Sequence, residues 1–149
     1  MLLQPRSRRQ AGFTLLELIV VAALIATGTA LVTLALPDPD RTRLQHDAER
    51  LSALLEAARA QSRTLGQPVY WRLLPNGFQF EQGTPASGGP RRAMNWLDRH
   101  THVVAGNTFM VLGPEPILPP QGLLMARGDQ RITLSSDGVR PFTAEAVEP

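Results

Sequence analysis

The chain has 149 residues, no cysteine, and fifteen basic against thirteen acidic residues. Without cysteine, disulfides cannot stabilise the fold, and the length that follows the N-terminal apolar run suits one packed domain rather than two. The positive balance depends on Arg6, Arg8 and Arg9, and without them the remaining twelve arginines do not outnumber the acids, so a surface that binds nucleic acid is not expected.

A hydrophobic run from Phe13 to Leu36 is the first predicted element. Beyond Glu17 it contains no charged residue, and as a helix it would reach about 36 Å, against roughly 30 Å of bilayer hydrocarbon. The run is therefore predicted to be a single transmembrane helix. Three arginines precede it, while Asp38 and Asp40 follow it, which predicts a cytoplasmic N-terminus and an exported C-terminal part.

The junction Gly12-Phe13-Thr14-Leu15-Leu16-Glu17 resembles the N-terminus of type IV pilin and pseudopilin precursors, which carry a short basic leader, a glycine, a phenylalanine and a glutamate at the fifth mature position. The resemblance implies that residues 1–12 are a cytoplasmic leader, and that a prepilin peptidase cuts between Gly12 and Phe13 and N-methylates Phe13. An ordinary secretory signal is cut after its apolar stretch, whereas this stretch would be kept.

Glu17 is a carboxylate near the start of the predicted membrane helix. Such a group needs a cation or water, and the cost of burying it is lower near the interface than at the bilayer centre. The family suggests that Glu17 pairs with the amino terminus of a subunit, which would set the register between packed helices. The alternative is an acid that reaches the interface and has no partner.

A second helix is predicted after Pro37-Asp38-Pro39-Asp40, because each proline removes an amide donor and restricts the preceding residue. Its apolar face follows alternating spacings of three and four residues, formed by Leu44, Ala48, Leu51, Leu55, Ala58, Ser62 and Leu65. Gly66 and Pro68 end it. Residues 37–66 are thus predicted to be a stem and an amphipathic helix that packs within its own head.

The remaining residues, 67–149, are predicted to form a β-rich head. Strands at 69–74 and 78–81 flank the hairpin turn Pro75-Asn76-Gly77. Further strands are expected at 102–105, 108–112, 123–127, 131–135 and 139–143, with turns at Gly128-Asp129 and Asp137-Gly138. The breaker-rich stretch 83–90 is expected to be an exposed, mobile loop. A helix followed by antiparallel strands gives an α+β, pilin-like fold.

Few residues suggest catalysis or metal binding. The run Ser135-Ser136-Asp137 lacks a nucleophile-elbow motif and more simply caps a turn, so no enzymatic activity is predicted. His100 and His102 could share one face of a strand, but no third ligand is evident, so solvent-facing histidines are preferred and no metal or cofactor is assigned. Most of the aromatic residues are assigned to the core rather than to a base-stacking platform.

The order of elements resembles the H-type minor pseudopilins of type II secretion. The resemblance rests on the helix stop at Gly66, the hairpin that carries Trp71 and Phe78, and the closing Gly138-Val139-Arg140-Pro141-Phe142-Thr143. Many major subunits carry a proline at the position of Leu34, which speaks against a major shaft subunit. The resemblance implies an inner-membrane protein with a periplasmic head, which joins a periplasmic filament near its tip and helps to export folded proteins across the outer membrane.

The implied partners are other minor and major pseudopilins, the prepilin peptidase and N-methyltransferase, and an inner-membrane assembly platform. Two alternatives stay open. One is a minor type IV pilin of the FimT kind that acts in pilus assembly or DNA uptake, although the tail Thr143–Pro149 carries two acids and no base. The other is a plain membrane-anchored domain, for which Glu17 would be replaceable and Gly12 uncut.

Overall fold

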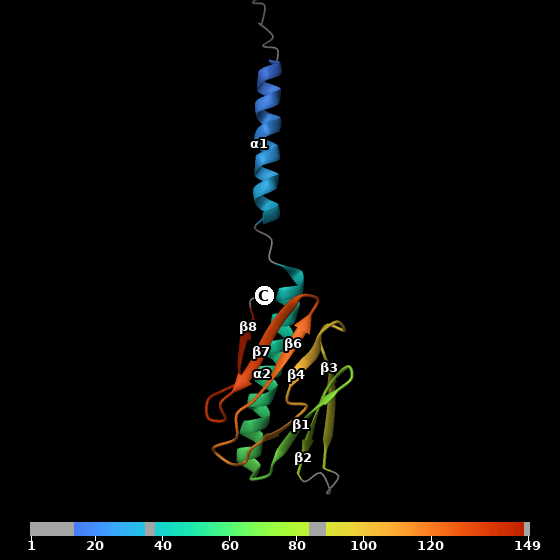
Figure 1. The fold of residues 1–149 in the computed structure, drawn as a ribbon, viewed down its shortest axis with the longest axis vertical. Coiled ribbons are helices and arrows are strands. Elements are labelled where there is room, and N and C mark those ends of the chain that lie inside the picture. The colour runs from blue at the N-terminus through green and yellow to red at the C-terminus, as the bar shows by residue number, and fades with distance from the viewer. Residues whose placement is uncertain (1–13, 35–37, 84–88, 148–149) are drawn as a thin grey trace, which may run out of the picture. The chain divides into compact units, whose positions relative to one another are not determined.

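The computed structural model describes residues 14–34, 38–83 and 89–147 (Figure 1). The chain divides into two compact units between Pro37 and Asp38, and the described part of the first unit is helix α1 (Leu15–Leu34). The leader 1–12, its junction residues Gly12 and Phe13, and both ends of the predicted span 13–36 lie outside the described residues. Within the residues that are described, no helix combines the length and apolarity needed to cross a membrane.

Helix α2 (Pro39–Leu65) opens the second unit. The Asp38 side chain accepts a hydrogen bond from the Asp40 amide at 2.8 Å, and Pro39 occupies the first turn, where an amide donor is not needed. At the other end Gly66 takes a left-handed conformation with φ of 63°, and its amide donates to the Ser62 carbonyl. The predicted stop at Gly66 is confirmed, whereas the helix begins at Pro39, inside the four-residue stretch after which it was predicted to start.

Among the described residues, eight strands form two antiparallel sheets beside α2 (Figure 1). The first sheet has the order β3-β2-β1-β5 and consists of β1 (Val69–Leu74), β2 (Gly77–Gln82), β3 (Arg91–Asn95) and β5 (Phe109–Leu112). The second has the order β4-β6-β7-β8 and consists of β4 (His102–Gly106), β6 (Gln121–Arg127), β7 (Gln130–Ser136) and β8 (Thr143–Ala146). The predicted α+β class, an N-terminal helix with antiparallel sheets, is confirmed.

The apolar face of α2 forms one side of the core. Leu44, Leu51 and Leu55 are fully buried, and Ser62 is buried at the step where the apolar spacing is interrupted. Leu65 was predicted on this face, but that prediction is wrong. It is 51% exposed, because it lies in the last turn, directly before the helix ends at Gly66.

Aromatic side chains from the first sheet and its neighbouring loops fill the other side of the core. Trp71, Phe78 and Trp96 are buried. The ring centroid of Phe78 lies 6.2 Å from that of Trp71 and 5.0 Å from that of Trp96. Phe142 joins the same cluster from the C-terminal region. Phe109 lies on the outer face of the sheet instead, stacked on Tyr70 with a centroid distance of 5.5 Å.

Two predictions about strands are wrong. No strand was expected at 91–95, yet β3 pairs there with β2 along its length. The strand was not predicted because two adjacent arginines beside a breaker-rich stretch show no strand pattern. The final strand was expected at 139–143 but begins at Thr143. The Asp137 carboxylate accepts hydrogen bonds from the amides of Val139 and Arg140, which holds this segment as a turn, and Pro141 offers no amide to a ladder.

Candidate functional site

The described part of α1 presents an uncovered apolar surface. Leu15 is 77% exposed, and the same holds in lesser degree for Leu16, Leu18, Ile19, Leu24 and Ile25. The Thr27 hydroxyl donates back to the Ala23 carbonyl at 2.7 Å, so a polar side chain within the helix is satisfied by the helix itself. A contiguous apolar surface of this size marks a site that lipid or another protein covers.

Glu17 is the one charged side chain among residues 14–34. Thr14 directly precedes the first residue of α1, and its hydroxyl and carbonyl oxygens accept from the Glu17 amide at 3.3 and 3.1 Å. An acid in the first turn is favoured by the helix dipole. The Glu17 carboxylate has no hydrogen-bond or ion-pair partner among the described residues. α1 therefore offers one carboxylate on an otherwise apolar surface.

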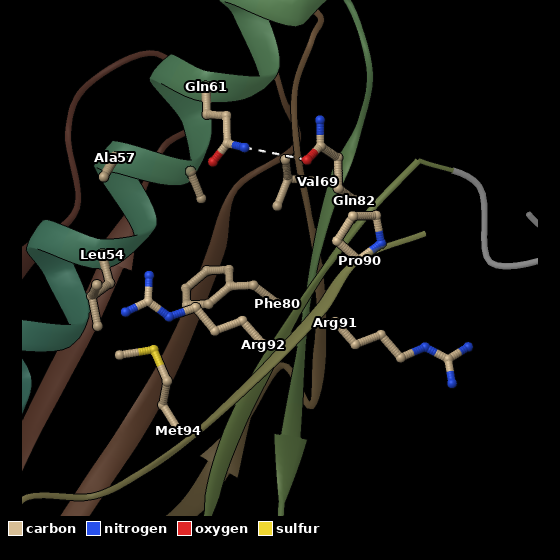
Figure 2. Close-up of a pocket in the computed structure, with 11 residues that line it drawn as sticks. Leu54, Ala57, Gln61, Val69, Phe80, Gln82, Pro90, Arg91, Arg92 and Met94 are labelled. Carbon is tan, nitrogen blue, oxygen red and sulfur yellow. Dashed lines mark hydrogen bonds between the residues drawn. The ribbon is translucent and has the colours of Figure 1, made fainter. Parts of the chain in front are cut away.

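The head carries a pocket of about 290 Å³ between α2 and the edge of the first sheet (Figure 2). Its apolar lining includes Leu54, Val69 and Phe80. Two further lining residues are hydrogen-bonded to each other, since the side-chain Nε2 of Gln61 donates to Gln82 Oε1 at 3.3 Å. Figure 2 shows the Arg92 side chain reaching toward Leu54 of α2. The pocket thus combines an apolar base with an arginine at its mouth.

Asp47 of α2 is buried to 1% exposure and anchors the segment that joins β3 to β4. Its carboxylate accepts from the Leu97 amide at 2.7 Å, the Asp98 amide at 3.2 Å and the Thr101 hydroxyl at 2.8 Å. These bonds give the buried carboxylate the donors that it requires and give the two amides and the hydroxyl an acceptor. The segment links the edge strands of the two sheets, so Asp47 fixes one sheet relative to the other.

Arg59 and Glu56, three residues apart on α2, hold the segment before β8. Arg59 is 1% exposed and donates to the carbonyl of Gly138 at 2.9 Å and of Arg140 at 3.1 Å. Glu56 accepts from the Phe142 amide at 3.0 Å and pairs with Arg59 at 3.1 Å. The helix therefore binds the closing segment, directly before β8 begins at Thr143, through both donors and acceptors.

A third charged cluster lies at the start of α2. Arg127 of β6 pairs with Asp40, and its Nη2 donates to Asp98 Oδ2 at 3.0 Å. The backbone amide of His100 and the Arg127 guanidinium together hold the pKa of the Asp98 carboxyl well below its usual range. The hydrogen bond to Asp98 in turn raises the pKa of Arg127. Both groups stay charged at neutral pH, so the ion pair between Arg127 and Asp98 persists there.

The two histidines considered from the sequence do not form a metal site with a third ligand. His100 and His102 are both exposed, and His102 Nδ1 lies 3.0 Å from the His100 carbonyl oxygen. In the part of the chain that the structure describes, no group of three or more His, Cys, Asp or Glu side chains converges on one point. The Ser136 hydroxyl accepts from the Gly138 amide and donates to the Arg140 carbonyl, so it caps the turn as predicted.

Sequence reasoning missed Asp47 and Arg59. Both lie on the apolar face of α2 by spacing, since Asp47 follows Leu44 by three residues and Arg59 follows Leu55 by four. A charge at a core position of an amphipathic helix is buried only when it is paired or hydrogen-bonded. The spacing alone therefore indicates that both charged side chains are buried and hydrogen-bonded. It does not indicate which segments of the chain they bind.

Residues 7–33 match the family described as the prokaryotic N-terminal methylation motif. Three curated proteins, each named type II secretion system protein H, are similar to the chain. The protein of Aeromonas hydrophila is 38% identical over 78 residues, which are 52% of this chain and 43% of that protein. The protein of Klebsiella michiganensis is 30% identical over 91 residues, which are 61% and 50% of the two chains.

The protein of Escherichia coli K12 is 37% identical over 78 residues, which are 46% of each chain. The chain thus spans about half the length of the curated relatives it matches. No solved structure matches it. A match to the methylation motif over an apolar helix, followed by an α+β head, makes the chain similar to the pilin-like class of proteins. Within that class, the resemblance to H-type minor pseudopilins of type II secretion, predicted from the sequence, is confirmed.

Proposed function

We propose that the chain is a minor pseudopilin of a type II secretion system, a structural subunit at or near the tip of a periplasmic filament that helps to export folded proteins. The observation that carries the proposal is α1, an exposed apolar helix with Glu17 as its one charged group, inside the matched methylation motif. The names of the relatives place them in type II secretion, which favours this role over a pilus or DNA-uptake role.

In this proposal the leader 1–12 is cytoplasmic, the segment 13–36 is held in the inner membrane, and the head from 67 onward lies in the periplasm on the stem 37–66. A prepilin peptidase removes the leader after Gly12 and methylates Phe13. The membrane first holds the apolar surface of α1, and neighbouring subunits then cover it in the filament. The work is mechanical rather than catalytic, and the partners are other minor and major pseudopilins and the inner-membrane assembly platform.

Glu17 acts in assembly because a carboxylate surrounded by apolar side chains is costly unless a cation neutralises it. The new amino terminus of a subunit, created by cleavage, is a cation at the right end of the helix. Pairing releases the cost of the isolated carboxylate only when two helices reach the correct axial register. Entry of the subunit into the filament is thus coupled to prior removal of the leader.

Mass spectrometry of the membrane-purified full chain, produced with its prepilin peptidase, tests the processing step. We expect an amino terminus at methylated Phe13 in the wild type and an intact leader in Gly12→Val. An uncut wild-type leader, or a cut after the apolar run, refutes the pseudopilin role.

Glu17→Gln tests the assembly step separately, because it removes the charge and keeps the side-chain shape. We expect the leader of this variant to be removed normally while the protein is lost from sheared filament fractions and exoprotein release falls. Glu115→Gln, at an exposed acid of the head, is the matched control and should assemble as the wild type does. A Glu17→Gln protein that assembles normally would remove Glu17 from the mechanism while leaving the processing step intact.

A further inference from the structure

The second sheet ends in a strand with an open edge. Its order is β4-β6-β7-β8, so β8 pairs with β7 on one side and has no strand on the other among the described residues. All four residues of β8, Thr143 to Ala146, are exposed. An open edge offers a row of backbone donors and acceptors to a further strand.

The register shows which backbone groups are free. The Val147 amide donates to the Arg131 carbonyl at 3.0 Å, and Glu145 lies opposite Thr133. Because alternate residues of an antiparallel strand bond to the same neighbour, Glu145 directs its amide and carbonyl toward β7. Ala144 and Ala146 therefore direct theirs toward the open side. Two donors and two acceptors are available there, at the spacing of a β-ladder.

A groove lies between the inner face of β8 and helix α2. Ala144 and Ala146 lie opposite Leu134 and Ile132, which face the core, so their side chains point to the α2 side of the sheet. The groove has a volume of about 450 Å³ and is lined by Ile132, the two alanines and the α2 residues Arg41, Gln45, Glu49, Ser52 and Ala53. A strand added to β8 would place alternate side chains in this groove.

The charge on β8 argues against a second copy of this chain as the added strand. Antiparallel pairing of two β8 strands through both alanines would set Glu145 directly opposite Glu145, and like charges in directly opposed positions destabilise a sheet. Glu145 has no ion-pair partner among the described residues. A strand of a different protein that carries arginine or lysine opposite Glu145 would form an ion pair with it.

We propose that the open edge of β8 receives an extended segment of a different filament subunit, which becomes a fifth strand of the second sheet. The added strand bonds to the backbone of Ala144 and Ala146, places small or apolar side chains in the groove, and presents a basic residue to Glu145. This inference rests on the proposed role in filament assembly. It adds a specific docking surface on the head, separate from α1 and from Glu17.

Proline substitution tests the strand directly. In Ala144→Pro and Ala146→Pro the amide that is lost faces the open side, so the ladder with β7 keeps its hydrogen bonds. Ala93→Pro on β3 is the matched control. The Gln82 amide donates to the Pro90 carbonyl, and this register turns the Ala93 amide to the open edge of the first sheet. All three variants should keep the thermal unfolding midpoint within a few degrees of the wild type.

The probe is the set of prepilin-like proteins encoded beside this chain, co-expressed with the full-length protein and purified in detergent. We expect a complex with the wild type and with Ala93→Pro, and at least about tenfold weaker association with Ala144→Pro and Ala146→Pro. Hydrogen exchange should show the amides of Ala144 and Ala146 protected in the complex and exposed in the free chain.

Glu145→Arg provides a second test that leaves the backbone intact, and it should weaken the same complex by repelling the basic residue of the partner strand. A complex that forms equally with the β8 proline variants, or with unprotected Ala144 and Ala146 amides, overturns the proposal, as does the absence of any complex with the wild type. An uncut leader refutes the pseudopilin role instead, so the two failures are distinguished by separate measurements.

Discussion

Replacing Arg59 by methionine tests whether a buried cation holds the segment that leads into β8. Methionine keeps most of the length and the apolar stem of the side chain but removes the guanidinium. The carbonyls of Gly138 and Arg140, which now accept from the guanidinium at 2.9 and 3.1 Å, each lose this charged donor and keep only the Leu118 amide and the Ser136 hydroxyl, respectively. Because Arg59 is 1% exposed, water does not replace those donors without opening the structure.

The magnitude follows from these contacts. A hydrogen bond to a charged group contributes about 1.5–3 kcal/mol, so two lost bonds correspond to about 3–6 kcal/mol. Methionine recovers part of this through apolar contact with Phe142, over whose ring the guanidinium lies at 5.8 Å. Glu56 is one-third exposed and can be solvated when its partner is gone. The net expected loss is about 2–4 kcal/mol in the free energy of unfolding of the head.

Urea unfolding of the full chain in detergent, followed by tryptophan fluorescence, measures this loss. Hydrogen exchange should also accelerate at the Phe142 amide, which donates to Glu56, before it accelerates in β1 or β2. Arg63→Met is the matched control, because Arg63 lies one turn later on the exposed face of α2, and it should change stability by less than about 0.5 kcal/mol. A loss below about 1 kcal/mol in Arg59→Met would refute the reasoning.

Three further changes test other parts of the head. Asp47→Asn should cost about 1.5–3 kcal/mol by urea unfolding, because it exchanges a buried acceptor for a donor, while exposed Asp129→Asn should be neutral. Leu51→Ala should cost about 2–5 kcal/mol, and Leu97→Ala, 61% exposed, far less. Since the folded pKa of Asp98 is depressed, its stabilisation is present above the ordinary pKa of about 3.9 and is lost as pH falls through the folded value. The unfolding free energy of Asp98→Asn should therefore decline less than that of the wild type between pH 5 and the lowest accessible pH. An equal decline in both proteins would show that the ion pair between Asp98 and Arg127 does not stabilise the head.

Local signals in the sequence were enough to predict most elements of the head. The helix stop at Gly66 requires a left-handed residue, and the hairpin turn between Leu74 and Gly77 consists of Pro75 and Asn76, two residue types that favour turns, so both features are determined by a few adjacent residues. β3 could not be predicted in this way. Its residues Arg91 and Arg92 have no strand pattern of their own, and their pairing with β2 depends on contacts across the breaker-rich stretch.

The same distinction applies to the candidate sites. Gly12, Phe13 and Glu17 follow from a contiguous motif, although the first two lie outside the described residues and the role of Glu17 stays a prediction. The head pocket and the open edge of β8 arise from residues far apart in sequence, such as Leu54 beside Phe80 and Gln45 beside Ala146. Neither surface has a local signature, because each depends on how the strands lie on α2.

A double-mutant cycle links the buried anchor to the open edge. Arg59 binds the carbonyls of Gly138 and Arg140, directly before β8 begins at Thr143, so Arg59→Met should weaken association with the neighbouring subunit by displacing β8. If Arg59 acts through β8, Arg59→Met combined with Ala146→Pro should bind no more weakly than the weaker single variant, because both remove one contact surface. Asp47→Asn, whose carboxylate holds the segment between β3 and β4, should instead combine additively with Ala146→Pro. Additive losses for the Arg59 pair would mean that the buried arginine stabilises the head without positioning the strand that docks.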